Sequence, residues 1–382
     1  MPIVLFFLNP VISIVYAFLM NIRKNKKVFY SFILLFSLFF GYSLTPRNTA
    51  LDSFQIIQIF KSWDVIFPSY SIFLGEWIKF DNHFAKDLYE GTIFFIVREF
   101  TNNYHFIFLF CALVFSIFKL KSFDFFLRDY KYSLLHIILT IFFFTSIPLF
   151  EINGFRFFSA AWMAIWATLK IFVDAKRRYL YLLALTPLVH ITFLFYLFMI
   201  AISYIAIRSV NEKLLLYLFV ASIFIGLVWD TLPNIVDIGD GVLGDLLKSY
   251  LNDDYKSEID TAVRESNFVK FFAPLRFLYY NITTLMLYIS CKDIERKKFV
   301  MLVLIFLSIT NCVGFIPSMS RFLNVIIPFI LIILNHSISC AKNLKVFVCF
   351  LPVVELFRFY QIYFTLYPDV LPDGFLLNIF LV

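Results

Sequence analysis

The sequence predicts an all-α polytopic membrane protein with about 10–12 transmembrane or re-entrant helices. Of its 382 residues, 61% are hydrophobic and only 15% are charged, whereas soluble domains average about 25% charged residues. Apolar runs of about 15 to 20 residues recur along the chain, close to the length that crosses a bilayer core of about 30 Å. These observations exclude a soluble globular protein, and we interpret 1–382 as a single integral membrane domain.

The N-terminal part predicts two spans and a large loop. Basic residues follow the apolar run 2–20 rather than precede it, which indicates a retained anchor with an outer N-terminus, not a cleaved signal peptide. The run 28–44 returns the chain to the outside. The segment 45–103 carries five Lys/Arg against seven Asp/Glu and is the expected first external loop.

The next three apolar runs predict spans over 104–118, 132–150 and 155–173. Basic residues gather where the chain is expected to be on the cytoplasmic side: Lys119, Lys121, Arg128, Lys131, Lys170, Lys176, Arg177 and Arg178. The net charge of +7 therefore follows from membrane orientation and does not indicate a nucleic-acid partner.

The run 179–207 is expected to be broken near Pro187 and His190. A single crossing would place the later basic cluster at 292–298 outside, against the usual charge bias. Twenty-nine residues are too few for two full spans of about 20 residues each. The sequence therefore predicts a re-entrant or broken pair of helices, a form that membranes tolerate where it lines a cavity.

The C-terminal half predicts five more spans and a second external loop. The loop, 230–267, carries nine Asp/Glu against three Lys/Arg. The internal loops are too short for a nucleotide-binding domain, and no Gly-rich phosphate loop occurs. The spans are 214–229, 268–290, 299–316, 322–338 and 346–366.

The arginines of the outer half predict an anion site. Seven of the 13 Lys/Arg expected there are arginines, whose planar guanidinium binds phosphate or carboxylate with two hydrogen bonds. Arg156 and Arg321 each open a span, and Arg276 lies within another. Ionisable residues in spans are costly and often functional, although snorkelling to the interface would also explain the two at span ends. Arg358 is interpreted as a local ion pair with Glu355.

His190 and two carboxylates complete the candidate site. Eleven residues of helix after Tyr179 span about 16 Å, which places His190 near the membrane centre; packing within the bundle is the alternative. Five external carboxylates are candidates for base or sugar-binding groups, with solvated loop residues as the alternative for most of them: Asp52, Asp87, Glu90, Glu99 and Glu151. Of these we single out only Asp52 and Glu151. No His or Cys pair has metal-ligand spacing, so neither a metal nor a cofactor is expected.

The run Asn153-Gly154-Phe155-Arg156, followed by a small-residue span, a basic turn and His190, resembles the EpsG-like group of Wzy-type polysaccharide polymerases. The spacing from Arg156 to His190 is 34 residues. The segment 98–115, the Arg321-Phe322-Leu323 run and an early Asp, here Asp52, are also similar to that group. The chain departs from the pattern of that group at two places. Phe157 and Phe158 follow Arg156 where a Gln is common, and Ile191 and Thr192 follow His190 where an aromatic residue and a Ser are common.

The resemblance implies a GT-C-like, metal-independent glycosyltransferase of the bacterial inner membrane, with its active site facing the periplasm. It implies transfer of a growing O-antigen or capsule glycan from undecaprenyl pyrophosphate to the next lipid-linked repeat unit. Arg156, Arg276 and Arg321 would bind the pyrophosphate. The catalytic set would comprise Arg156, His190, Glu151 and Asp52.

The implied partners are the lipid-linked donor and acceptor oligosaccharides and the bilayer, with a chain-length regulator as a further candidate and no nucleic acid. External aromatics are candidates to stack on sugars, with an interfacial belt as the alternative: Trp63, Tyr70, Trp77 and Tyr89.

Two other functions stay open. A flippase would show internal repeats and charges along several spans, and neither is found; an O-antigen ligase or an acyltransferase would also work on a lipid carrier, and a ligase would use the same donor and similar arginines.

Overall fold

The computed structural model describes residues 25–47, 51–79, 87–129, 133–228, 267–291, 293–314, 316–338 and 341–360, together with residue 16. Every regular element in these ranges is a helix, and they contain no strand. The predicted span 2–20, almost all of the second external loop 230–267 and the end of the last predicted span lie outside the described residues. The all-α class is confirmed for the described part of the chain.

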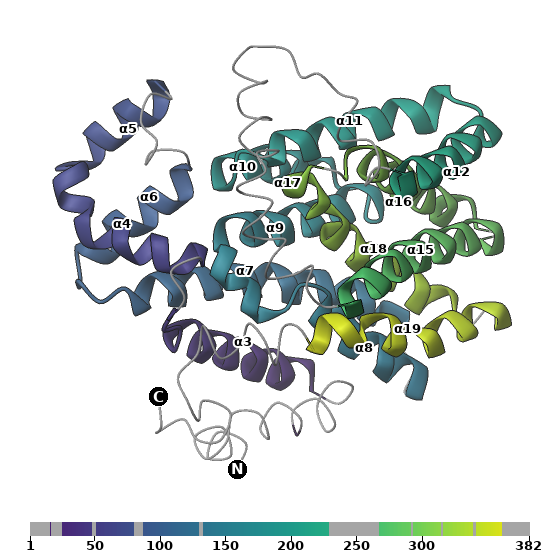
Figure 1. Ribbon diagram of the computed structural model, residues 1–382, viewed down its shortest axis with the longest axis horizontal. Helices are drawn as coiled ribbons and strands as arrows, with labels where there is room; N and C mark the ends of the chain where they lie inside the picture. The colour runs from purple at the N-terminus through teal and green to yellow at the C-terminus, as the bar shows by residue number, and fades with distance from the viewer. Residues whose placement is uncertain are drawn as a thin grey trace.

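The predicted spans after the first correspond to helices at closely similar positions (Figure 1). In the first half these are α3 (Lys26–Tyr42), α7 (His105–Phe126), α8 (Leu134–Ser146) and α9 (Phe155–Phe172). In the second half they are α12 (Glu212–Val228), α15 (Asn267–Ser290), α16 (Ile294–Val313), α18 (Phe322–Ser337) and α19 (Lys342–Tyr360).

Two helical runs of the described chain are long and apolar enough to cross a membrane, His105–Phe126 and Leu134–Phe172. Phe193–Ser209 and Phe322–Ser337 are apolar but shorter. These runs support a membrane location, and the full number of crossings stays a prediction.

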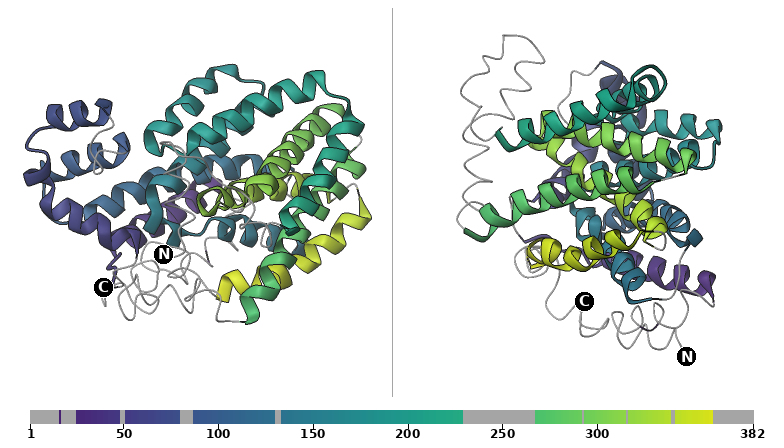
Figure 2. Two further views of the ribbon diagram at one scale, coloured as in Figure 1. Left: turned by 45° about the horizontal axis from the view of Figure 1, so that its top comes forward. Right: turned by 90° about the vertical axis from the view of Figure 1, so that its right-hand side faces the viewer.

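The predicted first external loop is helical rather than irregular. It forms α4 (Asp52–Ile66), α5 (Tyr70–Lys79) and α6 (Leu88–Arg98), which lie to one side of the main bundle in Figure 1 and in the left view of Figure 2. Trp63 has no exposed surface and packs against Phe73 and Phe94 at ring distances of 5.5 and 4.9 Å. Neither sugar stacking nor an interfacial belt, the two roles considered for Trp63, fits this burial, because its ring forms the core of this unit.

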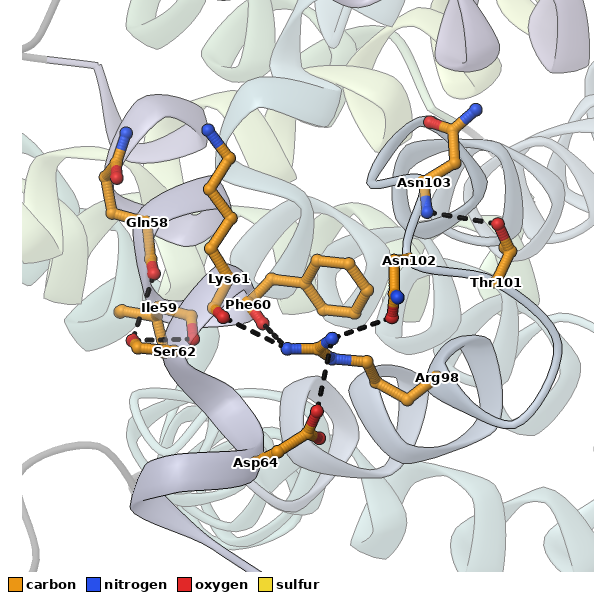
Figure 3. A network of polar contacts seen from close by, with 10 residues as sticks. All are labelled: Gln58, Ile59, Phe60, Lys61, Ser62, Asp64, Arg98, Thr101, Asn102 and Asn103. Atoms are coloured by element: carbon orange, nitrogen blue, oxygen red, sulfur yellow. Dashed lines mark hydrogen bonds and ion pairs between the residues drawn. The ribbon is translucent and has the colours of Figure 1, made fainter.

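Arg98 joins α4 to the end of α6 (Figure 3). Its Nη2 donates to the carbonyl oxygens of Phe60 and Lys61 at 2.7 and 3.1 Å. Its Nη1 donates to Asn102 Oδ1 at 2.7 Å and lies 3.2 Å from Asp64 Oδ2. This arginine, which the sequence places on the outer side, thus holds two helices together. It fixes the unit that carries Asp52 and Glu90 in the first turns of α4 and α6.

Lys119 is buried inside the bundle, not in an inside loop as predicted. Helix α7 continues past the expected end to Phe126, and Lys119 within it is only 3% exposed. Its Nζ donates to the carbonyl oxygens of Phe144 and Ile147 at 2.8 and 2.7 Å. The last carbonyls of a helix have no partner within it and attract a cation, so Lys119 satisfies the end of α8.

The turn after α9 is closed by Asp174, as its mixture of acidic and basic residues suggests. Asp174 accepts from Arg128 Nη1 and from Lys170 Nζ, each at 2.7 Å. Burial acts to raise the pKa of this carboxyl, but the hydrogen bonds from Arg128 and Lys170 outweigh it and hold the pKa below its ordinary value. The stability that these contacts contribute is present above the ordinary pKa and lost as the pH falls through the lowered one.

Helix α9 is the central element that positions the site. It packs against α7, α10 (Leu180–Val189) and α18, and both of its termini are attached to short connections. Small side chains on α9 allow these neighbours to approach closely: Ser159, Ala160, Ala161 and Ala164, all fully buried. The buried middle of α9 fixes the direction of its first turn, which carries Arg156.

Candidate functional site

Arg156 is the second residue of α9 and forms an ion pair with two acids at the start of α6. Its Nη1 lies 2.8 Å from Glu90 Oε2 and 3.3 Å from Asp87 Oδ2. The side chains of Glu90 and Asp87 are only 7% and 4% exposed, whereas that of Arg156 is 27% exposed. The alternative that these two acids are solvated is wrong: the start of α6 docks on the start of α9 and buries both.

His190 lies at a break between α10 and α11 (Phe193–Ser209), as the sequence predicts. Pro187 has no N–H for the Leu183 carbonyl, and the Thr186 hydroxyl donates to that carbonyl at 2.7 Å instead. Three residues after Pro187, His190 adopts an extended conformation and ends α10. Whether α10 and α11 return to the same side of a membrane stays a prediction.

The hydrogen bonds of His190 determine which ring nitrogen carries a proton. The Thr192 N–H donates to His190 Nδ1 at 3.3 Å, and Thr192 Oγ1 lies 2.8 Å from the same nitrogen. An N–H can donate only to an unprotonated nitrogen, so we assign the proton of the neutral ring to Nε2. His190 thus offers a donor at Nε2.

Asp87 connects this break to Arg156. Its Oδ1 accepts from the Ile191 N–H at 3.2 Å, while its Oδ2 faces Arg156. Both oxygens of this buried acid are therefore engaged, one by the residue after His190 and one by the guanidinium. Asp87 fixes the position of the histidine relative to α9.

Arg321 faces the same histidine from α18. It is the N-cap of that helix, and its guanidinium lies 6.0 Å from the centre of the Phe157 ring. His190 contacts the same Phe157 ring, at a ring distance of 5.6 Å in an edge arrangement. The charges of Arg156 and Arg321 both act on His190. Within the described ranges no carboxylate forms an ion pair with Arg321.

We name the group Asp87, Glu90, Arg156, His190 and Arg321 the arginine–histidine site. Asp52, the first residue of α4, lies at its edge: a Cβ added to Gly154 would be 3.6 Å from Asp52 Oδ2. The Asp52 charge also acts on Arg156. The structure therefore brings together four residues that the sequence singled out, Arg156, His190, Arg321 and Asp52, from four separate segments.

Arg276 and Glu151 form a neighbouring group. Arg276 Nε donates to Glu355 Oε1 at 2.8 Å, and Nη2 donates to Asn324 Oδ1 at 3.1 Å. Asn324 lies three residues after Arg321 on α18, which connects the two groups. The Glu151 charge acts on Arg276.

Glu355 lies on α19 and forms an ion pair with Arg276, which lies on a different helix, α15. The sequence predicts Arg358, one turn away, as its partner. The Arg358 side chain lies outside the described residues, so that pairing stays a prediction. The contact between α15 and α19 shows that Glu355 serves to hold Arg276 in place.

Asp87 and Glu90 are functional candidates that sequence reasoning named among five external carboxylates but did not single out. A signal for them exists, because Asp87 is the N-cap of α6 and Glu90 lies in its first turn. An acid at the N-cap followed three residues later by a Glu is typical of a helix start. That pattern predicts where α6 begins, but it does not show that the helix start docks on Arg156.

The described part of the chain contains no group of three or more His, Cys, Asp or Glu side chains that could hold a metal ion. The polar groups that converge here are guanidinium donors, the Nε2 donor of His190 and carboxylate acceptors. Such a set can bind an anion at one side and hydroxyl groups at the other.

The fold and the site define a helical membrane protein with a partly buried cluster of arginines, acids and a histidine. The model of the EpsG family matches residues 70–373, which is most of the chain, and the protein belongs to this family. No curated protein and no solved structure matches the chain. Family membership indicates a polysaccharide-polymerase-like function.

Proposed function

We propose that the protein is a polysaccharide polymerase of the bacterial inner membrane. It transfers a growing glycan from undecaprenyl pyrophosphate to the next lipid-linked repeat unit, at a site that faces the periplasm. The chain crosses the membrane many times in this proposal, and the helices of 45–103 lie outside. The family match supports the reaction class, and the chemistry of the arginine–histidine site supports the donor.

The observation that carries the proposal is the state of Arg321. It is held beside His190 and Phe157 without a carboxylate partner in the described ranges. Arg156 and Arg276, in contrast, are each paired with buried acids. A guanidinium without an acid keeps its full charge for a phosphate, and a low-dielectric setting strengthens that interaction. We therefore assign the pyrophosphate first to Arg321, with Arg156 and Arg276 as supporting donors.

The reaction requires charge stabilisation and one proton transfer. The acceptor hydroxyl oxygen attacks the anomeric carbon of the donor glycan, and the bond from that carbon to the phosphate oxygen breaks. The electron pair of that bond leaves with the lipid pyrophosphate, where Arg321 and His190 Nε2–H can stabilise the developing charge. The hydroxyl proton passes to a carboxylate, for which Asp52 and Glu151 are the candidates from sequence.

His190 is the subject of a specific prediction in this scheme. The amide nitrogen of Gln can replace a donor at Nε2, whereas Asn reaches only the position of Nδ1. We expect His190→Gln to retain more turnover than His190→Asn or His190→Ala, which should lose on the order of 10²-fold or more. Polymerisation rates of the three purified variants test this. Equal rates in all three and in wild type would return His190 to a packing role.

Two other functions remain as outcomes of a test. A flippase would move lipid-linked sugars without joining them, and a ligase would transfer the finished glycan to a different acceptor. Deletion of the gene, followed by glycan gel analysis, separates the three. We expect loss of long chains with single repeat units still attached to the lipid core. Loss of every attached unit would contradict the polymerase and support a ligase or flippase; restoration of the ladder by plasmid-borne wild type is the control.

A further inference from the structure

One carboxylate oxygen of Glu90 is buried and accepts no hydrogen bond from the rest of the site. Its side chain is 7% exposed, and Oε2 accepts from Arg156 at 2.8 Å. Its other oxygen, Oε1, is buried and has no hydrogen-bond partner in the described part of the chain. Burying a charged acceptor without a donor is costly, and such atoms are rare in native structures. An acceptor kept open beside Arg156 points to a donor supplied by a ligand.

The other acceptor atoms of the arginine–histidine site are already engaged. Both oxygens of Asp87 are engaged, by the Ile191 N–H and by Arg156. The Nδ1 atom of His190 is taken by Thr192, which leaves that ring as a donor. Of the two acids paired with Arg156, Glu90 is therefore the one that keeps an acceptor oxygen.

Access to Glu90 is through Arg156. The Arg156 side chain is 27% exposed, and its Nη1 touches Glu90 directly. The pair therefore lies just beneath an accessible surface, close to the first turn of α9 where Asp52 also lies. A hydroxyl group that binds next to Arg156 comes within reach of Glu90.

We propose that Glu90 binds a sugar hydroxyl of the lipid-linked acceptor and removes its proton during transfer. The assignment rests on the proposed function and replaces Asp52 and Glu151 as the base. The O–H proton moves to Glu90 Oε1, the acceptor oxygen bonds to the anomeric carbon, and the pyrophosphate leaves with the electron pair of the broken C–O bond. Glu90 then releases the proton to water, which restores the carboxylate.

The variant Glu90→Gln distinguishes a Glu90 that accepts the proton from one that only positions Arg156. In Glu90→Gln the amide oxygen can still accept from Arg156 and the volume is kept, but the side chain no longer takes a proton. We expect Glu90→Gln to reduce kcat by about 10²- to 10⁴-fold, with KM, donor binding and melting temperature near those of wild type. The matched control is Glu99→Gln, at the exposed end of the same helix, which should leave all four unchanged.

Each outcome decides the assignment. Wild-type kcat in Glu90→Gln overturns it and leaves Glu90 as a partner of Arg156. Loss of donor binding or of melting temperature in Glu90→Gln also overturns it, because the role would then be structural. Failure of the wild-type protein itself to polymerise in the same assay would instead contradict the proposed function.

Discussion

Replacing Arg321 by alanine should slow polymer formation by about 10²- to 10³-fold while leaving the fold intact. Its guanidinium has no acid partner within the described ranges, so its removal leaves no buried carboxylate unpaired. Loss of one donor to the developing charge costs about 2.7–4 kcal/mol, or 10²- to 10³-fold in rate. The measurement is the polymerisation rate of purified Arg321→Ala, with its melting temperature recorded alongside.

Two further variants serve as comparisons for Arg321→Ala. Arg321→Lys keeps the charge but not the planar fork, and we expect an intermediate rate. Arg208, in the last turn of α11, is exposed and stacks on Tyr204 at 3.8 Å, so Arg208→Ala should match wild type. An Arg321→Ala protein that polymerises normally would show that the pyrophosphate binds elsewhere.

Replacing Arg156 by alanine should eliminate polymer and also destabilise the protein. Two acids that are more than nine-tenths buried, Asp87 and Glu90, would lose their shared cation. Removing one partner from a buried ion pair typically costs about 3–5 kcal/mol, so about that loss of unfolding free energy is expected. The measurements are glycan gels of the complemented deletion strain and the melting temperature in detergent.

The double variant Arg156→Ala with Glu90→Gln tests the cause of this destabilisation. Neutralising one acid should recover part of the lost stability, because less uncompensated charge stays buried. Polymer should remain absent in both variants. An Arg156→Ala protein with wild-type stability would contradict the buried ion pair.

Hydropathy predicted the helices because the bilayer constrains their length and composition directly. The break at His190 was also predictable, since Pro187 cannot donate to Leu183 and all basic loops are expected on the same, cytoplasmic side. Arg156 and Arg321 stood out because arginines are enriched among the basic residues expected on the outer side, and ionisable residues at apolar spans are often functional. These features depend on local sequence or on the membrane alone.

The pairing of charges could not be predicted, because it depends on how distant helices dock. Glu90 and Asp87 lie in a segment rich in solvated acids, and only the contact of α6 with α9 distinguishes them. Glu355 has an arginine one turn away, yet it bonds Arg276 from α15. Lys119 follows an apolar run as a loop residue would, and its burial depends on the end of α8.

The most direct test of the central claim is polymerisation by the purified protein in vesicles. The substrate is a synthetic repeat unit on undecaprenyl pyrophosphate, and the assay measures both the chains formed and the lipid pyrophosphate released. The proposal predicts one lipid pyrophosphate released per linkage formed, with the rates of both products lowered by about 10²- to 10³-fold in Arg321→Ala. Transport of the substrate without bond formation, or chains of equal yield from Arg321→Ala, would contradict it.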